Sequence, residues 1–371
     1  DIYEILNEIN NLCGNSPKIF VTATYKKPLD VYNINKDEAK LTWDINDINI
    51  MKKIDTIKDS ENEIKKRFGD IYTETIKNYN KTELKKLYSF FPEPYLITSV
   101  WDYKYLNREK MKIGDTDYGF DMEKLFTVKK SSDNEYTDEF SNHESVVNIL
   151  RYYFGYPDKK QDYEHQHIVR HRGILPRIKR ICENRCRTMQ IKNKPTTQLW
   201  FLPYGQQRPI KNVVNALLQI INEGDNQFKY IKENYYFFVA LDENILQKKY
   251  DNVEYYNKSS KKSIKDQIIE LENDIKMGER EGTPIKQNNL IILAGARLQL
   301  GISLRNVDIV TLWNNISSTD AIFQMLFRSM TEVDSAECLK SEYCDNKKFG
   351  FMVDLNPQRA LTNVFMFKDN L

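Results

Sequence analysis

The sequence contains no long hydrophobic run and few cysteines. No stretch of about 18 uncharged apolar residues occurs in the 371 residues, and the first residues form neither a basic nor an apolar signal-peptide region. The five cysteines are an odd number, which fits a reducing compartment better than a disulfide framework. We therefore expect an intracellular protein without a membrane partner. A hydrophobic content of 40% predicts that the chain folds around real cores.

The chain also lacks a strong net charge. Lysine and arginine total 55 against 53 acidic residues, so nucleic-acid binding would depend on local patches. One candidate patch is arginine-rich, and its basic residues are Arg170, Arg172, Arg177, Lys179, Arg180, Arg185 and Arg187. The alternative is that these side chains are the solvated face of a helix whose core stripe is Ile174, Ile178, Ile181 and Cys182. The sequence favours neither reading.

Two kinds of ligand-binding motif are missing. No G-x-x-x-x-G-K-[ST] phosphate loop occurs, so these residues contain no self-contained ATP site. A short stretch gathers histidines and cysteines, but their spacing fits no standard zinc finger: His165, His167, His171, Cys182 and Cys186. We expect no metal site there.

From residue 174 onward, apolar strands alternate with amphipathic helices. The pattern predicts strands at 198–202, 235–241, 290–294, 307–313 and 349–354, with helices at 174–189, 210–221 and 263–276. This alternation predicts an α/β fold with a doubly wound parallel sheet. Ligands of such sheets bind at the carboxyl ends of the strands. The segments expected there are Pro203-Tyr204-Gly205, residues 295–301 and Asn314-Asn315.

Residues 288–331 are the most informative stretch. The strand LIILA leads through a glycine-bearing turn to the strand VDIVTLW, and Ser317-Ser318-Thr319 then offers a helix cap. Helical spacing groups Ile322, Met325, Leu326 and Ser329 on one side and Asp320, Gln324, Arg328 and Thr331 on the other. One face can be buried, and the other can meet a ligand.

These residues resemble the carboxyl-side half of superfamily 2 helicases and translocases. LGISL at 300–304 followed by VDIV at 307–310 resembles motif V, and QMLFRSMT at 324–331 resembles motif VI. TAT at 22–24, at the end of an apolar strand, resembles motif III. The resemblance covers residues 19–24 and 198–331. The Arg-x-Met-Thr pattern is similar to viral and phage members, which would place the protein in the host cytoplasm, the nucleus or the virion.

The resemblance implies a domain organisation. Residues 1–45 would be the end of a first RecA-like domain, 46–172 a largely helical insertion with a polar loop at 129–142, and 173–371 the second RecA-like domain. ATP and Mg²⁺ would lie between the two RecA-like domains and be held mainly by residues that precede this chain. We therefore expect a fragment that starts after motif II and is inactive alone.

The resemblance also implies site residues. Arg328 would neutralise charge on the transferring phosphoryl group, with Gln324 beside it. Gly301, Ser303 and Asp320 would contact the nucleotide. The residues expected to contact the backbone of DNA or RNA are Thr22, Thr24, Lys26, Pro203 and Tyr204. Motif VI usually has a second arginine where Thr331 stands, so Arg328 would act alone. Taken by itself, Arg328 would be an ordinary surface arginine.

The resulting hypothesis is an ATP-dependent nucleic-acid helicase or translocase, represented by its carboxyl-side motor half. A first alternative is a non-hydrolysing RecA-like module for nucleic-acid binding or assembly, which the missing phosphate loop favours. A second is the motor subunit of a restriction-type nuclease, although no clustered acid-and-lysine nuclease motif is evident.

Overall fold

A computed structural model describes the main part of the chain. The described residues are 45–54, 80–98, 122–155, 173–186, 196–206, 208–224, 228–241, 250–296, 298, 302–331, 347–356 and 359, with isolated residues between 62 and 78. All of them belong to one compact unit, residues 44–371. This unit spans both the expected insertion and the expected second RecA-like domain.

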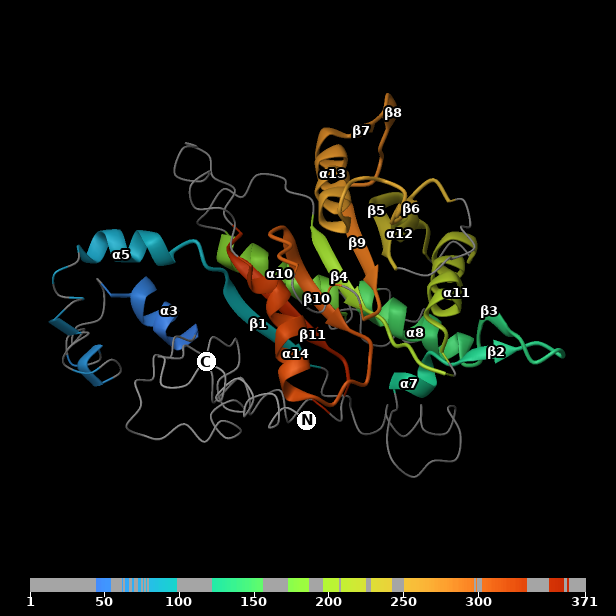
Figure 1. Ribbon diagram of the computed structural model, residues 1–371, viewed down its shortest axis with the longest axis horizontal. Coiled ribbons are helices and arrows are strands. Elements are labelled where there is room, and N and C mark those ends of the chain that lie inside the picture. Colours follow the sequence, from blue (N-terminus) through green and yellow to red (C-terminus); the bar gives the residue numbers. More distant parts are fainter. Residues whose placement is uncertain are drawn as a thin grey trace, which may run out of the picture. The chain divides into compact units, whose positions relative to one another are not determined.

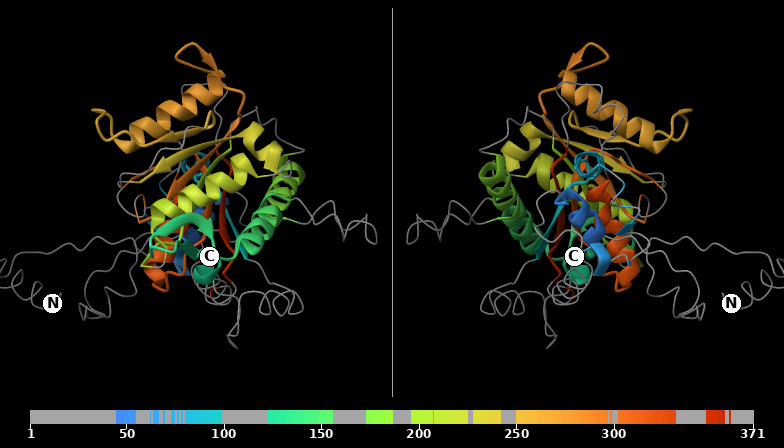
Figure 2. Two further views of the ribbon diagram at one scale, coloured as in Figure 1. Left: turned by 90° about the vertical axis from the view of Figure 1, so that its right-hand side faces the viewer. Right: turned by 90° about the vertical axis from the view of Figure 1, so that its left-hand side faces the viewer.

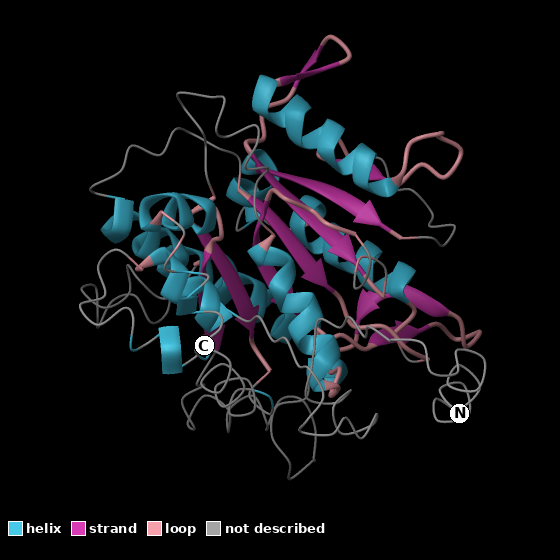
Figure 3. Cartoon of the chain, turned by 60° about the vertical axis from the view of Figure 1, so that its left-hand side comes forward, coloured by secondary structure: helices cyan, strands magenta, loops and turns pink. Residues whose placement is uncertain are grey.

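Seven parallel strands form the central sheet, in the order β1-β11-β10-β4-β9-β5-β6 (Figure 1). The long strand arrows that are visible in the middle of Figure 3 point the same way. The strands are β1 (Glu93–Thr98), β4 (Thr197–Phe201), β5 (Tyr235–Ala240), β6 (Val253–Tyr255), β9 (Asn289–Ala294), β10 (Val307–Leu312) and β11 (Phe349–Asp354). The five strands predicted from residue 198 onward are confirmed, to within one residue at each end, whereas the strand expected before residue 24 lies outside the described residues.

Helices cover both faces of this sheet, and each face has its own hydrophobic core. One face packs against α8 (His143–Phe154), α10 (Ile174–Cys186), α11 (Ile210–Glu223) and α12 (Lys229–Asn234). The other packs against α13 (Ile264–Met277) and α14 (Thr319–Leu326). Burial on both sides explains why the central strands are continuous apolar runs instead of alternating patterns. The predicted fold, a RecA-like doubly wound α/β sheet, is confirmed.

An aromatic cluster attaches α8 to the middle of the sheet. The ring centroids of Tyr153 and Trp200 lie 5.0 Å apart, and those of Trp200 and Trp313 lie 5.3 Å apart. The Tyr153 hydroxyl also lies 2.8 Å from both Gln198 Oε1 and Thr311 Oγ1. Full burial raises the pKa of Tyr153, so the hydroxyl stays neutral and satisfies two buried polar groups.

The region before residue 173 contains more strand than the sequence predicted. β1 pairs with β11 along its whole length and forms one edge of the central sheet. The expected polar loop at 129–142 is wrong, because a hairpin of β2 (Val128–Lys130) and β3 (Tyr136–Phe140) occupies it. The hairpin is rich in charged residues, and these obscure the sequence signal of its two buried apolar residues, Val128 and Phe140. The Asp138 carboxylate accepts hydrogen bonds from Asn212 and Asn215 of α11.

Short helices complete this region. α3 (Ile45–Lys52) and α5 (Lys81–Tyr88) share a small core around Met51, Ile54 and Ile64, and α7 (Met122–Leu125) packs against the large core. A second hairpin, β7 (Glu279–Arg280) with β8 (Thr283–Pro284), projects from the end of α13 (Figure 2). Among the helices that the structure describes, none is long and apolar enough to cross a membrane.

Candidate functional site

The carboxyl ends of the parallel strands lie along one edge of the sheet, and the segments that follow them form the candidate site. Tyr204 follows β4, the loop of residues 295–306 follows β9, and Asn314 follows β10. A lysine-rich turn of residues 256–262 follows β6. This edge is where a doubly wound sheet binds ligands.

The loop between β9 and β10 is held at both ends by buried leucines. Leu298 is only 3% exposed and Leu304 only 4%, and both belong to the core beneath α13 and α14. Leu298 adopts a left-handed backbone with φ of 69°, which costs free energy for a residue with a branched side chain. Ser303, between these anchors, is exposed. The loop therefore presents Ser303 at the carboxyl edge, whereas Gly301 lies outside the described residues.

Arg328 contacts this loop directly. Its Nη1 donates a hydrogen bond to the backbone carbonyl of Ile302. The side chain is half-buried, and this burial lowers the pKa of the guanidinium, which keeps its charge because an arginine pKa starts far above neutral. The segments that resemble motifs V and VI are thus joined by a charge-assisted hydrogen bond.

Arg328 lies on a 3₁₀ turn and not on the helix that the sequence predicted. The expected helix through Thr331 is wrong, since α14 ends at Leu326 and the turn η2 (Phe327–Met330) follows. Two hydroxyls account for this ending: Ser329 Oγ donates to the Leu326 carbonyl and Thr331 Oγ1 to the Arg328 carbonyl. Such side-chain bonds compete with the helical ladder.

The two expected faces of this segment are otherwise found. Ile322, Met325, Leu326 and Ser329 are all buried, at 1% exposure or less. On the opposite side, Gln324 and Thr331 are partly exposed. Asp320 lies in the first turn of α14, which Ser318 caps by accepting from the Ala321 amide. The sequence pattern therefore predicted correctly which side of this segment faces the core.

Gly350 of β11 makes room for the turn that carries Arg328. A Cβ atom built at Gly350 would lie 2.5 Å from the Ser329 carbonyl oxygen and 2.6 Å from Met330 Sδ. Real Cβ atoms do not approach backbone this closely, so any larger residue would displace η2. The position of Arg328 thus depends on a glycine in the neighbouring strand.

The residues expected to contact nucleic acid are only partly described. Tyr204 is 42% exposed, whereas Pro203 before it is buried. A short bridge between Gly205 and Arg208 closes the turn behind Tyr204, with backbone hydrogen bonds of 3.1 and 3.0 Å. Thr22, Thr24 and Lys26 lie outside the described residues.

The arginine-rich helix has the expected core stripe. In α10, Ile174 and Ile178 are buried, and Ile181 and Cys182 pack against the same core. The described basic side chains on its other side, Arg177, Lys179 and Arg180, are exposed. The helix is amphipathic, and on its exposed side Lys179 lies 4.0 Å from the Glu183 carboxylate.

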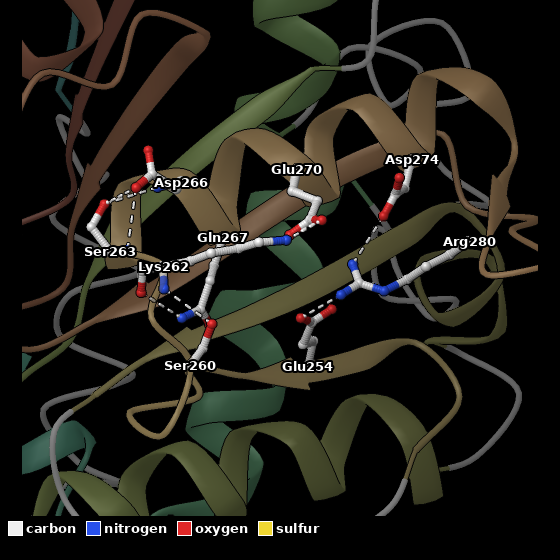
Figure 4. Close-up of polar contacts among 9 residues, drawn as sticks. All are labelled: Glu254, Ser260, Lys262, Ser263, Asp266, Gln267, Glu270, Asp274 and Arg280. Carbon is white, nitrogen blue, oxygen red and sulfur yellow. Dashed lines mark hydrogen bonds and ion pairs between the residues drawn. The ribbon is translucent and has the colours of Figure 1, made fainter.

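Sequence reasoning missed the lysine-rich turn between β6 and α13. Lys258, Lys261 and Lys262 are exposed there, at the carboxyl end of β6. Lys262 also forms an ion pair with Glu270 (Figure 4). The signal in the sequence is the run KSSKK directly before a helix cap.

Hydrogen bonds from a side chain of α13 order this turn. Gln267 Nε2 donates to the carbonyls of Asn257 and Lys262 at 3.0 and 3.1 Å, and its Oε1 accepts from the Asn257 amide at 2.9 Å. Ser263 and Asp266 form a capping box at the start of the helix (Figure 4). Hydrogen bonding to Ser263 lowers the pKa of Asp266. The lysines therefore project from an ordered support.

The described part of the carboxyl edge carries basic side chains and a hydroxyl. No group of three or more His, Cys, Asp or Glu side chains that could hold a metal is found within the described ranges. Cations and an exposed hydroxyl are present at the carboxyl edge instead, in Arg328, the lysine-rich turn and Ser303.

Comparisons with known proteins do not assign this chain to a family. No known family profile and no curated protein matches the sequence. Among solved structures, the C-terminal part of the Fun30 ATPase domain is similar, at 12% identity and a TM-score of 0.25, over 83% of this chain and 78% of that chain. Because both values are low, the fold assignment rests on the sheet itself. The comparisons do not support a specific likeness to viral or phage helicases.

Proposed function

We propose that this chain is the carboxyl-side motor half of an ATP-dependent nucleic-acid translocase or helicase. The observation that carries the proposal is the hydrogen bond from Arg328 to the Ile302 carbonyl. It joins the two segments that resemble motifs V and VI, at the sheet edge where RecA-like folds bind ligands. Partial burial of a charged guanidinium costs free energy, so this position favours a functional role over that of an ordinary surface arginine.

Arg328 would act on phosphate. A guanidinium is always charged and forks onto two oxygens, so it suits the charge that develops on a transferring phosphoryl group. Gln324, partly exposed one helical turn earlier, would help to orient the reacting groups, and Ser303 and Asp320 would contact the nucleotide. Gly301, two residues before Ser303 in the sequence, would allow the backbone to approach the nucleotide.

ATP and Mg²⁺ would be held largely by residues other than these. The sequence has no phosphate loop, and the described residues have no metal-binding cluster. When bound, Mg²⁺ would neutralise charge on the phosphate oxygens. The cradle for ATP would come from residues outside this sequence, and Arg328 would complete the site from the second domain. Closure around ATP would then draw the two domains together.

Nucleic acid would bind along the same edge through its backbone. The exposed Tyr204 offers a stacking surface, and Lys258, Lys261 and Lys262 offer cations for phosphates. Thr22, Thr24 and Lys26 would add further contacts to the backbone of the nucleic acid. Such contacts carry little sequence information, so we expect weak sequence preference. DNA is the partner we test first, and RNA is the second.

The test is ATP hydrolysis by the complete protein encoded by the gene, with and without single- or double-stranded DNA. The proposal predicts hydrolysis that DNA stimulates. DNA binding without any hydrolysis would instead support a non-hydrolysing RecA-like module, which the missing phosphate loop favours. DNA cleavage coupled to hydrolysis would point to the motor subunit of a nuclease.

A further inference from the structure

A buried ion pair lies at the carboxyl end of β11. Arg359 is 7% exposed and Asp354 is 0% exposed, and Arg359 Nη2 donates to Asp354 Oδ1 at 2.9 Å. Two charges withdrawn from water cost several kcal/mol unless further hydrogen bonds satisfy them. This pair therefore needs additional partners, and they come from another segment.

The same guanidinium reaches the loop between β10 and α14. Arg359 Nη1 donates to Asn314 Oδ1 at 3.2 Å and to the Ile316 carbonyl at 2.9 Å. Asn356 makes a parallel connection, because its Nδ2 donates to Asn315 Oδ1 at 2.6 Å while its amide donates to Asp354 Oδ1 at 3.0 Å. These hydrogen bonds fix residues 314–316 to the end of β11. We call this group the Arg359 network.

The loop fixed in this way leads directly into the helix that precedes Arg328. Ser318, two residues after Ile316, caps α14. Asn314 also lies against the helix, with its Nδ2 3.8 Å from Met325 Sδ. A shift of residues 314–316 would therefore move the start of α14, and with it Gln324 and the turn η2.

We propose that Arg359 is a positioning residue for Gln324 and Arg328. This inference rests on the proposed function. It does not require Arg359 to contact ATP. Its guanidinium holds the β10–α14 loop against β11, so that α14 and η2 present their polar side at a fixed place on the carboxyl edge. Misplacement of a catalytic group by about 1 Å can cost about a hundredfold in rate, so a distant tether of this kind affects catalysis.

The experiment uses the complete protein with Arg359→Met and Arg359→Lys, each also combined with Arg328→Ala. We expect Arg359→Met to lower kcat for DNA-stimulated ATP hydrolysis at least about tenfold while KM for ATP changes less than about twofold. Lysine should restore part of the rate. In the Arg328→Ala background, Arg359→Met should cost less than in the wild type, because one of the two groups that it positions is already gone.

Hydrogen exchange supplies a readout that does not need ATP. Amides of residues 321–326 should exchange faster in Arg359→Met, whereas amides of β4 and β9 should keep their rates. The matched control is Arg280→Met, which removes another arginine paired with two carboxylates, Glu254 at 2.8 Å and Asp274 at 3.2 Å (Figure 4). This control should leave both kcat and the exchange of α14 unchanged.

The two proposals fail in different ways. A wild-type protein without ATP hydrolysis would refute the motor function, and the exchange rates of α14 would still decide whether Arg359 positions that helix. Normal kcat in Arg359→Met, in a wild type that hydrolyses ATP, would overturn the inference. If Arg359→Met does not fold, Asn314→Ala removes one contact of the same loop, and an unchanged kcat together with unchanged exchange of α14 would equally overturn it.

Discussion

Arg328 donates a hydrogen bond to the backbone carbonyl of Ile302, 26 residues earlier in the chain. The contact joins the 3₁₀ turn after α14 to the loop between β9 and β10. Leu298 and Leu304, on either side of Ile302 in that loop, are both buried in the core. Their burial limits the movement of the Ile302 carbonyl that accepts the hydrogen bond. Under the proposed function, a phosphate group that attracts the guanidinium of Arg328 would also affect the loop that contains Ile302.

Replacing Gly350 with alanine should displace the turn that carries Arg328. The added Cβ would meet the Ser329 carbonyl at 2.5 Å, so η2 must move away from β11. We expect a loss of about 1–3 kcal/mol in the free energy of unfolding, as for other overpacked sites, and a fall in kcat for ATP hydrolysis. Urea unfolding and steady-state kinetics measure the two effects.

The control for this substitution is Gly282→Ala. Gly282 has a φ of 78° and no atom within 4 Å of a Cβ, so alanine there costs only backbone conformation, in a hairpin outside the carboxyl edge. It should lower stability without changing kcat. Equal kcat in Gly350→Ala and wild type would show that the position of η2 does not matter for hydrolysis.

The lysine-rich turn should make DNA binding sensitive to salt. Each lysine that contacts phosphate contributes about one unit to the slope of log Kd against log salt concentration, so Lys258→Ala with Lys261→Ala should lower the slope by about two. Titration of a fluorescent DNA at several salt concentrations measures it. Lys276→Ala is the control, since Lys276 is exposed at the other end of α13, about 20 Å away. An unchanged slope in the double variant would remove the turn from the DNA site.

Tyr204 should contribute to the binding of single strands by stacking. The residue is 42% exposed at the carboxyl edge, and stacking on an aromatic ring is worth about 1–3 kcal/mol per base. Tyr204→Ala should weaken binding of an oligonucleotide by the corresponding factor, measured by fluorescence anisotropy. Tyr230→Ala is the matched control, because Tyr230 is 55% exposed on α12, before the amino end of β5. Similar losses in both variants would argue against a specific stacking site.

The cap of α13 should stabilise the protein in a pH-dependent way. Ser263→Ala removes the N-cap hydroxyl and should lower the free energy of unfolding by about 1 kcal/mol at neutral pH. Hydrogen bonding to Ser263 lowers the pKa of Asp266 in the folded state, so this contribution is present above the unfolded pKa near 4 and is lost as the pH falls through the folded pKa. The difference between wild type and Ser263→Ala should therefore shrink below about pH 4. A difference that is independent of pH would contradict the carboxylate's part in the cap.

The sequence was sufficient for the central strands and the buried side of α14, because both depend on local pattern. Strands such as β4 and β9 are buried on two faces and appear as unbroken apolar runs. β1 was missed since it is a half-buried edge strand that contains Pro94, and β6 was missed because it has only three residues. Neither carries a periodic signal long enough to distinguish it from a loop.

The site was predictable only where its residues are close in sequence. Gln324 and Arg328 lie within one motif, but the 3₁₀ turn under Arg328 depends on hydroxyl bonds that no periodicity indicates. Arg359 was missed because its partner Asn314 lies 45 residues away. The role of Gly350 depends equally on a contact between separate segments, which only the folded chain reveals.

The most direct test of the motor function is the rate of DNA-stimulated ATP hydrolysis by the complete protein with Arg328→Ala. Removal of an arginine that neutralises transition-state charge should lower kcat by about a thousandfold, with DNA affinity unchanged. Arg328→Lys should recover little, because an ammonium cannot fork onto two phosphate oxygens. Hydrolysis at the wild-type rate in Arg328→Ala would contradict the assignment of Arg328 and the proposed ATP site built around it.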